Sequence, residues 1–211
     1  VYEFIQGYKM FITFEGLEGT GKTTQINKLA DYLSAKKHDV IITKEPGGTE
    51  FGQIIRQIIL DPKTTFKHHY TELLLFFADR AEHVEHIIKP ALAAKKIVLC
   101  DRYIDSTYAY QCEARGIPID IIKRLDQMIN LTPDITYLFD CDPKIGLARA
   151  SKRAALDRFE QEELSFHENV RKGFHKRAKA EQKRINIINI EEKNIEEIAK
   201  IIQENISKKL V

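Results

Sequence analysis

A glycine-rich run followed by lysine and threonine is the part of this sequence with the clearest chemical capability. Gly16, Leu17, Glu18, Gly19, Thr20, Gly21, Lys22 and Thr23 fit the pattern GxxxxGK[ST], and Thr24 follows them. Glycines let the backbone turn so that several N–H groups point at one anion, and a following helix adds the positive end of its dipole. Lys22 has the reach to contact the β- and γ-phosphates of a nucleotide, and the Thr23 hydroxyl can bind Mg²⁺. We therefore expect the whole run, with Thr24, to bind ATP.

The phosphate loop alone leaves the class of protein open, because GTPase switches, motor-like ATPases and small-molecule kinases share it. A GTPase should carry an Asn-Lys-x-Asp motif after a late strand, and the sequence has none. A large assembly ATPase normally needs a chain longer than 211 residues. A nucleoside monophosphate kinase fits best. A kinase of another acceptor, such as adenylate, guanylate or a deoxynucleoside, and a binding module that hydrolyses ATP slowly stay as alternatives.

The elements that must position this loop follow from hydrophobic periodicity. Short apolar runs predict strands at 11–15, 40–44, 97–101, 135–140 and 185–190, and a helix is expected from about Lys22 to Lys37. Amphipathic stretches lie between the strands, one of them with Leu73, Leu74, Phe77, Ala81 and Val84. Strands that are apolar on both faces and separated by helices predict an α/β fold, a five-stranded parallel sheet with helices on both faces. Ligands then bind beyond the carboxyl ends of the strands.

Composition limits the partners and the organisation of the chain. Its 33 basic and 31 acidic side chains leave a charge of +2, too little to predict nucleic acid or a membrane as the main partner. The 3 cysteines lack the paired spacing of a zinc site. With neither a membrane-length apolar run nor a signal peptide in the sequence, we expect a cytoplasmic protein. Residues 1–9 are interpreted as an N-terminal extension, and residues 10–211 as one kinase domain.

Four further motifs resemble the thymidylate kinase family of bacterial type. They are TKEPGGT at 43–49, LFFADR at 75–80, DRY at 101–103 with Ser106, Thr107, Tyr110 and Gln111, and LDRFE at 156–160. Their order and spacing match the family over nearly the whole chain from Met10. The resemblance implies a P-loop NTP hydrolase fold, phosphorylation of dTMP to dTDP with ATP and Mg²⁺ in dTTP synthesis, and a homodimer.

The resemblance also assigns residues that read the acceptor base. Phe76 and Arg80 are four apart and share one helix face, so the ring can stack on thymine while the guanidinium donates to its O4. A donor-only arginine would reject the amino group of cytosine. Thr107 and Gln111 face the base edge in the family, and Tyr110 lies near the sugar 2′ position, where its bulk favours deoxyribose.

The phosphates and the metal are assigned to residues at strand ends. Asp101 closes an apolar strand, where a Walker B carboxylate would hold Mg²⁺ through water, together with Thr23. By resemblance Arg102 clamps the acceptor phosphate, Arg56 lies near that phosphate, and Glu45 joins the polar network of the site.

The basic segment 149–160 is interpreted as a short lid, although charge runs are more often a solvated helix face. Glu18 followed by Gly19, rather than arginine, resembles the family branch whose catalytic arginine is in the lid, and the resemblance puts Glu18 on the acceptor 3′-hydroxyl. Arg149 and Arg153 are four apart, so on a continued helix they would share one face. We expect both to be catalytic, with Lys22 and Arg102. Arg158 is expected to contact ATP at the adenine or a phosphate.

Overall fold

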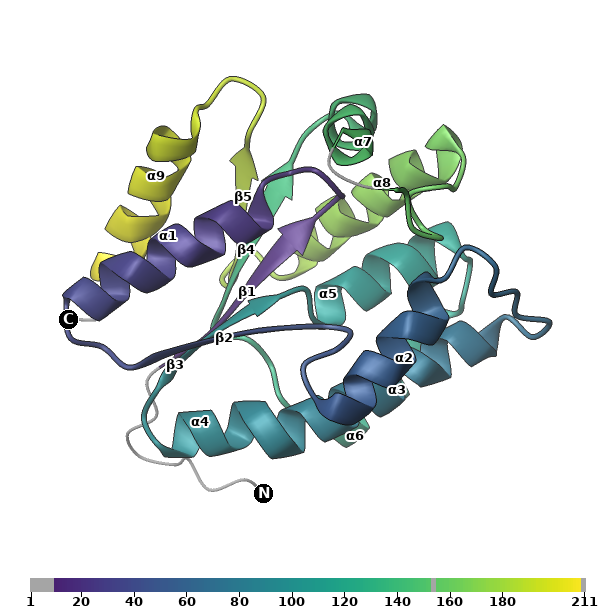
Figure 1. Cartoon of the computed structure of the whole chain (residues 1–211), viewed down its shortest axis with the longest axis horizontal. Helices are drawn as coiled ribbons and strands as arrows, with labels where there is room; N and C mark the ends of the chain where they lie inside the picture. The colour runs from purple at the N-terminus through teal and green to yellow at the C-terminus, as the bar shows by residue number, and fades with distance from the viewer. Residues whose placement is uncertain (1–9, 153–154, 210–211) are drawn as a thin grey trace.

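The fold is an α/β sandwich built on one parallel sheet, seen in a computed structural model of the chain that describes residues 10–152 and 155–209 (Figure 1). The strands lie in the order β2-β3-β1-β4-β5. They are β1 (Met10–Gly16), β2 (Val40–Lys44), β3 (Ile97–Asp101), β4 (Ile135–Asp140) and β5 (Ile185–Asn189). The predicted five-stranded parallel sheet is confirmed, with β1 one residue longer at each end and β5 one residue shorter than expected.

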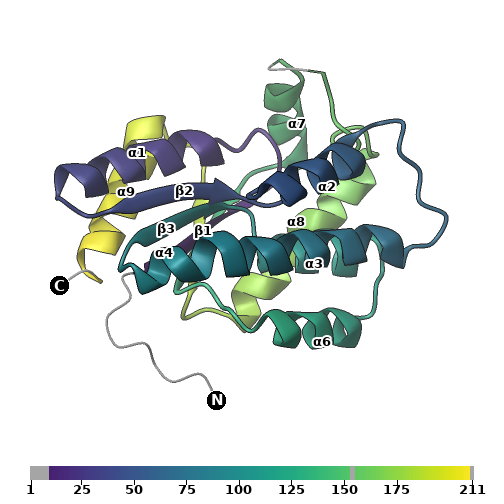
Figure 2. The same cartoon turned by 60° about the horizontal axis from the view of Figure 1, so that its bottom comes forward.

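Helices cover both faces of this sheet (Figures 1 and 2). On one face lie α1 (Lys22–Ala35) and α9 (Ile195–Ser207). On the other lie α3 (Tyr70–His83), the π-helical segment η1 (Val84–Ile88), α4 (Lys89–Ala93), α5 (Ile104–Thr107), the π-helical segment η2 (Tyr108–Ala114), α6 (Ile119–Ile129) and α8 (Leu164–Ala180). Helix α2 (Glu50–Leu60) packs on α3, and α7 (Pro143–Ser151) follows β4. Among the described helices, none is long and apolar enough to cross a membrane.

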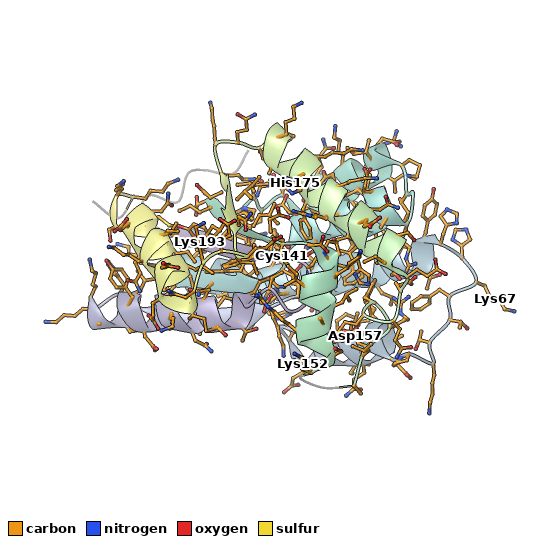
Figure 3. The ribbon with its side chains drawn as sticks, turned by 90° about the horizontal axis from the view of Figure 1, so that it is seen from above. Lys67, Cys141, Lys152, Asp157, His175 and Lys193 are labelled. Carbon is orange, nitrogen blue, oxygen red and sulfur yellow. The ribbon has the colours of Figure 1, made fainter. Side chains whose placement is uncertain are left out.

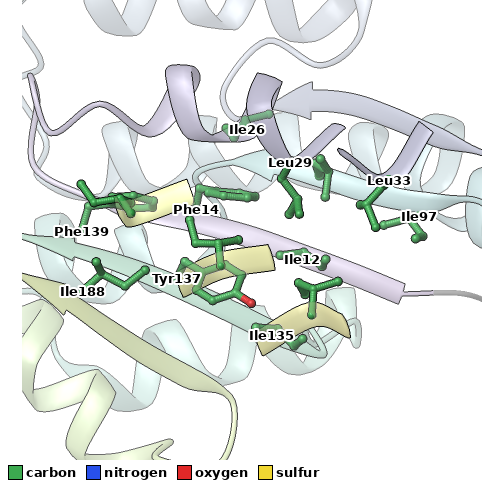
Figure 4. Packing of buried hydrophobic residues seen from close by; sticks show 14 of the residues in the cluster. Ile12, Phe14, Ile26, Leu29, Leu33, Ile97, Ile135, Tyr137, Phe139 and Ile188 are labelled. Carbon is green, nitrogen blue, oxygen red and sulfur yellow. The ribbon is translucent and has the colours of Figure 1, made fainter. Parts of the chain in front are cut away.

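The core consists of two layers because strand side chains alternate between the faces of the sheet. On β1, Ile12 and Phe14 pack toward α1 and α9 (Figure 4). Phe11, in contrast, packs toward the helices of the opposite face. On β3, Leu99 belongs to the first layer and Val98 to the second. All five side chains are buried, which explains why the strands read as continuous apolar runs.

Helix α3 departs from the pattern expected of it in one residue. Leu73, Phe77 and Val84 are buried, but Leu74 is 55% exposed. Neighbouring residues on a helix point about 100° apart, so Leu73 and Leu74 cannot both face one core. The side of α3 that carries Leu73 and Phe77 packs against the sheet. The side that carries Leu74 is exposed and, among the described residues, makes no such contact.

The polar segments of the sequence follow the carboxyl ends of strands β1, β2 and β3, so they lie together at one edge of the sheet. The phosphate loop follows β1, the Glu45-Pro46 segment follows β2, and Asp101 and Arg102 end or follow β3. The backbone N–H of Glu45 donates to the Asp101 carbonyl at 3.0 Å, and that of Arg102 donates to the Phe14 carbonyl at 3.0 Å. These bonds hold the three segments side by side at the edge where ligands bind in such sheets.

Candidate active site

A cavity of about 270 Å³ opens at this edge and collects most of the predicted site. The predicted residues that line it are Glu18, Gly19, Thr20, Gly21, Lys22, Thr23, Thr24, Glu45, Arg56, Phe76, Arg80, Asp101, Arg102, Thr107, Tyr110 and Gln111. They come from the phosphate loop, the segment after β2, α2, α3, the end of β3, α5 and η2. Gly16 and Leu17 are buried at the base of the loop. The phosphate loop and the pair predicted to read the base, Phe76 and Arg80, thus line one cavity.

The phosphate loop has the tight turn that its glycines predict. Gly19 has φ +69°, and a Cβ there would lie 2.1 Å from the Gly146 carbonyl oxygen, so only glycine fits. The Lys22 ammonium donates to the Gly16 carbonyl at 3.2 Å and to the Leu17 carbonyl at 2.7 Å. Burial, aided by the charge of Arg102, lowers the pKa of Lys22 to about 8. The ammonium is therefore held by weak neutral partners from which a phosphate can draw it.

Thr23 and Asp101 meet across the mouth of the loop. The Thr23 hydroxyl, in the first turn of α1, donates to Asp101 Oδ2 at 3.1 Å, at the end of β3. A hydroxyl and a carboxylate are hard oxygen donors of the kind Mg²⁺ prefers beside nucleotide phosphates. The donor set fits the ion.

Glu18 forms a polar hub with Arg102 and Tyr110. Its Oε1 accepts from Arg102 Nη2 at 2.9 Å and from the Tyr110 hydroxyl at 2.6 Å. Burial opposes ionisation of Glu18, but the charges of Arg102 and Lys22 and the Tyr110 hydrogen bond more than offset it, so its pKa lies below the usual value. Arg102 has φ +67°, a costly conformation for a non-glycine residue that surrounding structure must enforce. That turn directs its guanidinium back over the loop, where Nη1 donates to the Gly16 carbonyl at 2.8 Å.

Arg80 is fixed beneath the cavity with part of its guanidinium uncommitted. Its Nε donates to Glu45 Oε2 at 2.7 Å, and Glu45 Oε1 lies 2.9 Å from Nδ1 of His83. The Arg80 residue is 1% exposed, and its Nη1 has no hydrogen-bond partner among the described residues. Buried arginine donors rarely stay unpaired, which makes this nitrogen a candidate donor to a ligand. Phe76 lies on the same helix face and lines the same cavity.

Arg56 and Thr107 are two further predicted site residues that line the cavity. Arg56, on α2, donates through Nη1 to the Pro46 carbonyl at 2.9 Å, which leaves other guanidinium nitrogens for an anion. Thr107 ends α5 and is 1% exposed. Both residues line the cavity where the sequence expected them.

Arg158, which the sequence analysis expects to contact ATP, bonds here to Glu72 and to the end of α2. Its Nη2 donates to Glu72 Oε2 at 2.6 Å, and its Nε donates to the Ile59 carbonyl at 2.7 Å. Glu72 Oε1 in turn accepts from Gln111 Nε2 at 2.8 Å. Phe159 is buried in the apolar cluster beside α2 and α3. The guanidinium of the neighbouring Arg158 therefore lies at Glu72 rather than at the phosphate loop. Arg158 does not line the cavity in this arrangement, and its contact with ATP stays a prediction.

The basic segment 149–160 begins in α7 and is described except at residues 153 and 154; Figure 3 labels Lys152 and Asp157 on either side of that gap. Arg149 lines a second cavity that borders the phosphate loop at Gly19, Thr20 and Gly21. Helix α7 ends at Ser151, so it does not continue as the helix that would place Arg149 and Arg153 on one face. Arg153 lies outside the described residues.

Sequence reasoning missed four buried polar residues that surround the site. They are Glu15, Glu72, His83 and His167. His167, on α8, lies with Nδ1 3.8 Å from Glu18 Oε2, and neither of its ring nitrogens has a hydrogen-bond partner among the described residues. For Glu15 a signal was present, since a carboxylate inside an apolar strand must be buried. Helical positions such as Glu72 and His167 carry no such signal.

Comparisons with known proteins agree with this geometry. The family model described as thymidylate kinase matches residues 14–202. The thymidylate kinase of an Aster yellows witches'-broom phytoplasma is 46% identical over 201 residues, covering 93% of this chain and 96% of that protein. That of Desulfosudis oleivorans is 46% identical over 188 residues, covering 85% and 88%.

A solved structure extends the agreement to three dimensions. The crystal structure of thymidylate kinase from Ehrlichia chaffeensis superposes with a TM-score of 0.77 at 36% sequence identity, covering 95% of this chain and 99% of that one. The match of fold, the family model over most of the chain, and relatives aligned nearly end to end lead to one conclusion. This chain belongs to the thymidylate kinase family.

Proposed function

We propose that this chain transfers the γ-phosphoryl group of ATP to dTMP, giving ADP and dTDP in dTTP synthesis. The observation that carries the proposal is one cavity lined both by a phosphate loop and by the buried Arg80, whose Nη1 has no hydrogen-bond partner among the described residues. The likeness to thymidylate kinases supports the identity of the acceptor. Catalysis needs no covalent enzyme intermediate, because positioning and charge neutralisation suffice for phosphoryl transfer.

The acceptor base is proposed to lie between Phe76 and the polar wall formed by Arg80, Thr107 and Gln111. Arg80 Nη1 has a donor to offer to O4 of thymine, and Phe76 offers a ring to stack on. Cytosine would present an amino group to the same donor, leaving two donors opposed. Glu45 supports this role because it fixes Arg80 through a hydrogen bond of 2.7 Å.

The acceptor phosphate and sugar are proposed to meet Arg102, Arg56, Glu18 and Tyr110. Two guanidiniums beside one cavity suit bidentate binding of a phosphate. Glu18 accepts from Arg102 and Tyr110 through Oε1, and its Oε2 has no hydrogen-bond partner among the described residues, which leaves an acceptor for the 3′-hydroxyl. The buried ring of Tyr110 would close the space beside the 2′ carbon.

Mg²⁺ is proposed to bind at Thr23 and, through water, at Asp101, whose oxygens lie 3.1 Å apart. When bound, the ion neutralises phosphate charge. The protein adds cations of its own. Lys22 leaves the loop carbonyls for the phosphates, and Arg149 and Arg153 approach the γ-phosphoryl group when the lid closes. Each of these cations would stabilise charge that develops during transfer.

A homodimer in the cytoplasm, with no nucleic acid or membrane partner, completes the proposal. Helix α2 exposes Phe51, Ile54 and Ile58, which are three and four residues apart and share one face, and α3 exposes Leu74. An apolar face of this kind on adjoining helices supports a protein contact. Ile54→Asp should convert a dimer into a monomer in analytical ultracentrifugation. A wild-type monomer at micromolar concentration would refute the dimer and leave the reaction untouched.

A panel of acceptors with labelled ATP tests the reaction itself. We expect dTMP to exceed dCMP, AMP and GMP by at least about two orders of magnitude in kcat/KM, the scale of a site that leaves a polar group unpaired. Comparable rates with AMP or GMP would favour a kinase of another acceptor. ATP hydrolysis that no acceptor accelerates would instead favour a binding module.

A further inference from the structure

The amide of Gln111 is fixed in one orientation by a buried carboxylate. Gln111 is 1% exposed, lines the cavity, and donates through Nε2 to Glu72 Oε1 at 2.8 Å. An ionised carboxylate can only accept hydrogen bonds, so the NH₂ end of the amide must face Glu72. The carbonyl oxygen then occupies the other branch of the amide, away from Glu72.

Glu72 is itself locked in place by two arginines. It is 5% exposed on α3, and Arg158 Nη2 donates to its Oε2 at 2.6 Å. Arg115 Nε lies 3.6 Å from its Oε1, on the same side as Gln111. A buried anion paired in this way keeps its position, because moving it away from both arginines would leave a buried charge uncompensated.

Arg158 also bonds to the end of α2, which connects this arrangement to the segment interpreted as the lid. Its Nε donates to the Ile59 carbonyl at 2.7 Å, and its backbone N–H donates to the Leu60 carbonyl at 3.1 Å, both at the end of α2. Asp157, the preceding residue, lines the cavity. Arg158, which lies within the segment 149–160 interpreted as a lid, is thus bonded directly to the carboxylate that orients Gln111.

Resting on the proposed function, we propose that Glu72 is a specificity-determining positioning residue for the acceptor base, held in place by Arg158. Thymine presents an N3–H donor between two carbonyls, whereas cytosine presents a bare N3 acceptor. A Gln111 amide that offers only its oxygen accepts from thymine N3–H and repels cytosine N3. A freely rotating amide could offer its NH₂ to cytosine instead, and Glu72 prevents that rotation.

Glu72→Gln tests this directly, because a glutamine at 72 can both donate and accept and no longer dictates the orientation of Gln111. We expect the ratio of kcat/KM for dTMP over dCMP to fall by at least about tenfold, the scale of one hydrogen-bond mismatch in a specificity site. Arg80 still opposes cytosine at the 4 position, so part of the preference remains. In a Gln111→Ala background the same substitution should change the ratio no further, since its effect passes through that amide.

Glu113→Gln is the matched control. Glu113 lies on η2 with Gln111 but pairs at the surface with Lys176, at 2.7 Å. This variant should keep the wild-type ratio. A merely structural role for Glu72 would lower kcat/KM for both acceptors equally and leave the ratio unchanged, and that result would overturn the inference.

Folding of each variant is checked by circular dichroism. If Glu72→Gln does not fold, Arg158→Gln decides the matter, because it frees Glu72 Oε2 while Arg115 still balances its charge. The ratio should then fall by about threefold or more, and an unchanged ratio would overturn the inference. A wild-type enzyme that does not prefer dTMP would overturn the proposed function as well, whereas a wild-type preference that survives both variants overturns only the role of Glu72.

Discussion

The phosphate loop and the proposed base pocket share one cavity, but the side chains of each are held in place by different means. The functional groups of the loop come from consecutive residues, and its ammonium, that of Lys22, rests on carbonyls of the same loop. The groups of the base pocket come from α3 and η2, and each is fixed by another side chain: Arg80 by Glu45, and Gln111 by Glu72.

This difference separates selection of the acceptor from acceleration of the reaction. Arg80 and Gln111 already hold their positions, so little ordering remains to oppose binding of a matching base. In the proposed reaction, Lys22 exchanges its carbonyl partners for phosphate oxygens, and the lid adds further charge. Interactions that form late in this way act on the transition state rather than on ground-state binding. Substitutions in the two regions should therefore affect different kinetic constants.

Lys22→Ala should have the largest effect. It removes a charge that stabilises the transferring phosphoryl group, and losing one such donor typically costs 10²–10³ in kcat. The KM for dTMP should change by only a few fold, because Arg102 and Arg80 stay in place. Steady-state kinetics with saturating ATP measures both constants, and circular dichroism checks the fold. A KM for dTMP that rises as steeply as kcat falls would show that the two regions are not separable.

Arg153→Ala should lower kcat by about tenfold to a hundredfold, less than an arginine finger because Arg149 can partly substitute. The KM for dTMP should again change little. The double variant with Arg149→Ala should lose more than either single one, and Lys152→Ala serves as the neighbouring control with a smaller loss. Single-turnover rates would separate the chemical step from product release. Near-normal kcat in both the single and the double arginine variant would leave the basic segment as a solvated surface.

Tyr110→Phe should have a smaller effect, at the contact that joins the two regions. The ring packs against Phe159 and Phe166, with centroids 5.6 and 6.1 Å away, and its hydroxyl donates to Glu18 at 2.6 Å. Phenylalanine keeps the packing and removes only the hydrogen bond, worth about 0.5–1.5 kcal/mol. We expect kcat/KM for dTMP to fall about threefold to tenfold.

The preference of this variant for dTMP over its ribose counterpart should persist, since the ring that crowds the 2′ position remains. Kinetics with both acceptors checks this expectation. Tyr110→Ala would be a poorer test, because deleting a buried aromatic side chain costs about 3–5 kcal/mol and confuses specificity with stability. Loss of the deoxyribose preference in Tyr110→Phe would assign that filter to the hydroxyl instead of the ring.

The contrast between the regions also explains what could be predicted from the sequence. The phosphate loop is local, so consecutive residues revealed both its geometry and its chemistry. The strands were found because a sheet buried on both faces leaves unbroken apolar runs. The base pocket depends on contacts between distant residues, and only the family resemblance indicated Arg80 and Gln111.

Two features of the pocket had no local signal. The π-helical turn η2, which carries Tyr110 and Gln111, differs from an α-helix by the backbone bond each residue makes, and side-chain periodicity does not record that choice. The pairing of Arg158 with Glu72 depends on where the chain goes between them, across 86 positions. The pattern of charges along the sequence cannot show which distant carboxylate an arginine will pair with.

Glu15 lies outside both regions. We expect its substitution to change activity less than any substitution described above. It lies in β1, is fully buried, and accepts from the Tyr103 backbone N–H at 2.9 Å and from the Ser106 hydroxyl at 2.5 Å. Burial, with the nearby charge of Asp105, raises the pKa of Glu15 to about 8. Glu18, three positions on, has its pKa lowered instead, so these two carboxyl groups should respond to pH with opposite signs.

The sign follows from proton binding. Between the ordinary glutamate pKa of about 4.5 and the folded value of about 8, the folded state retains a proton on Glu15 that the unfolded state has lost. The free energy of unfolding therefore falls as pH rises through this window. The amide in Glu15→Gln resembles the protonated carboxyl and does not ionise. The variant therefore lacks this fall in the free energy of unfolding with rising pH. The variant should match the wild type near about pH 5 and be more stable by about 1–3 kcal/mol near about pH 8.5, measured by urea unfolding at both values. Glu18→Gln is the control of opposite sign, because it deletes an ionised carboxylate and should destabilise the protein at the higher pH. If Glu15→Gln also destabilises at about pH 8.5, then Glu15 is ionised in the folded protein, and its hydrogen bonds to Tyr103 and Ser106 outweigh the cost of burying its charge.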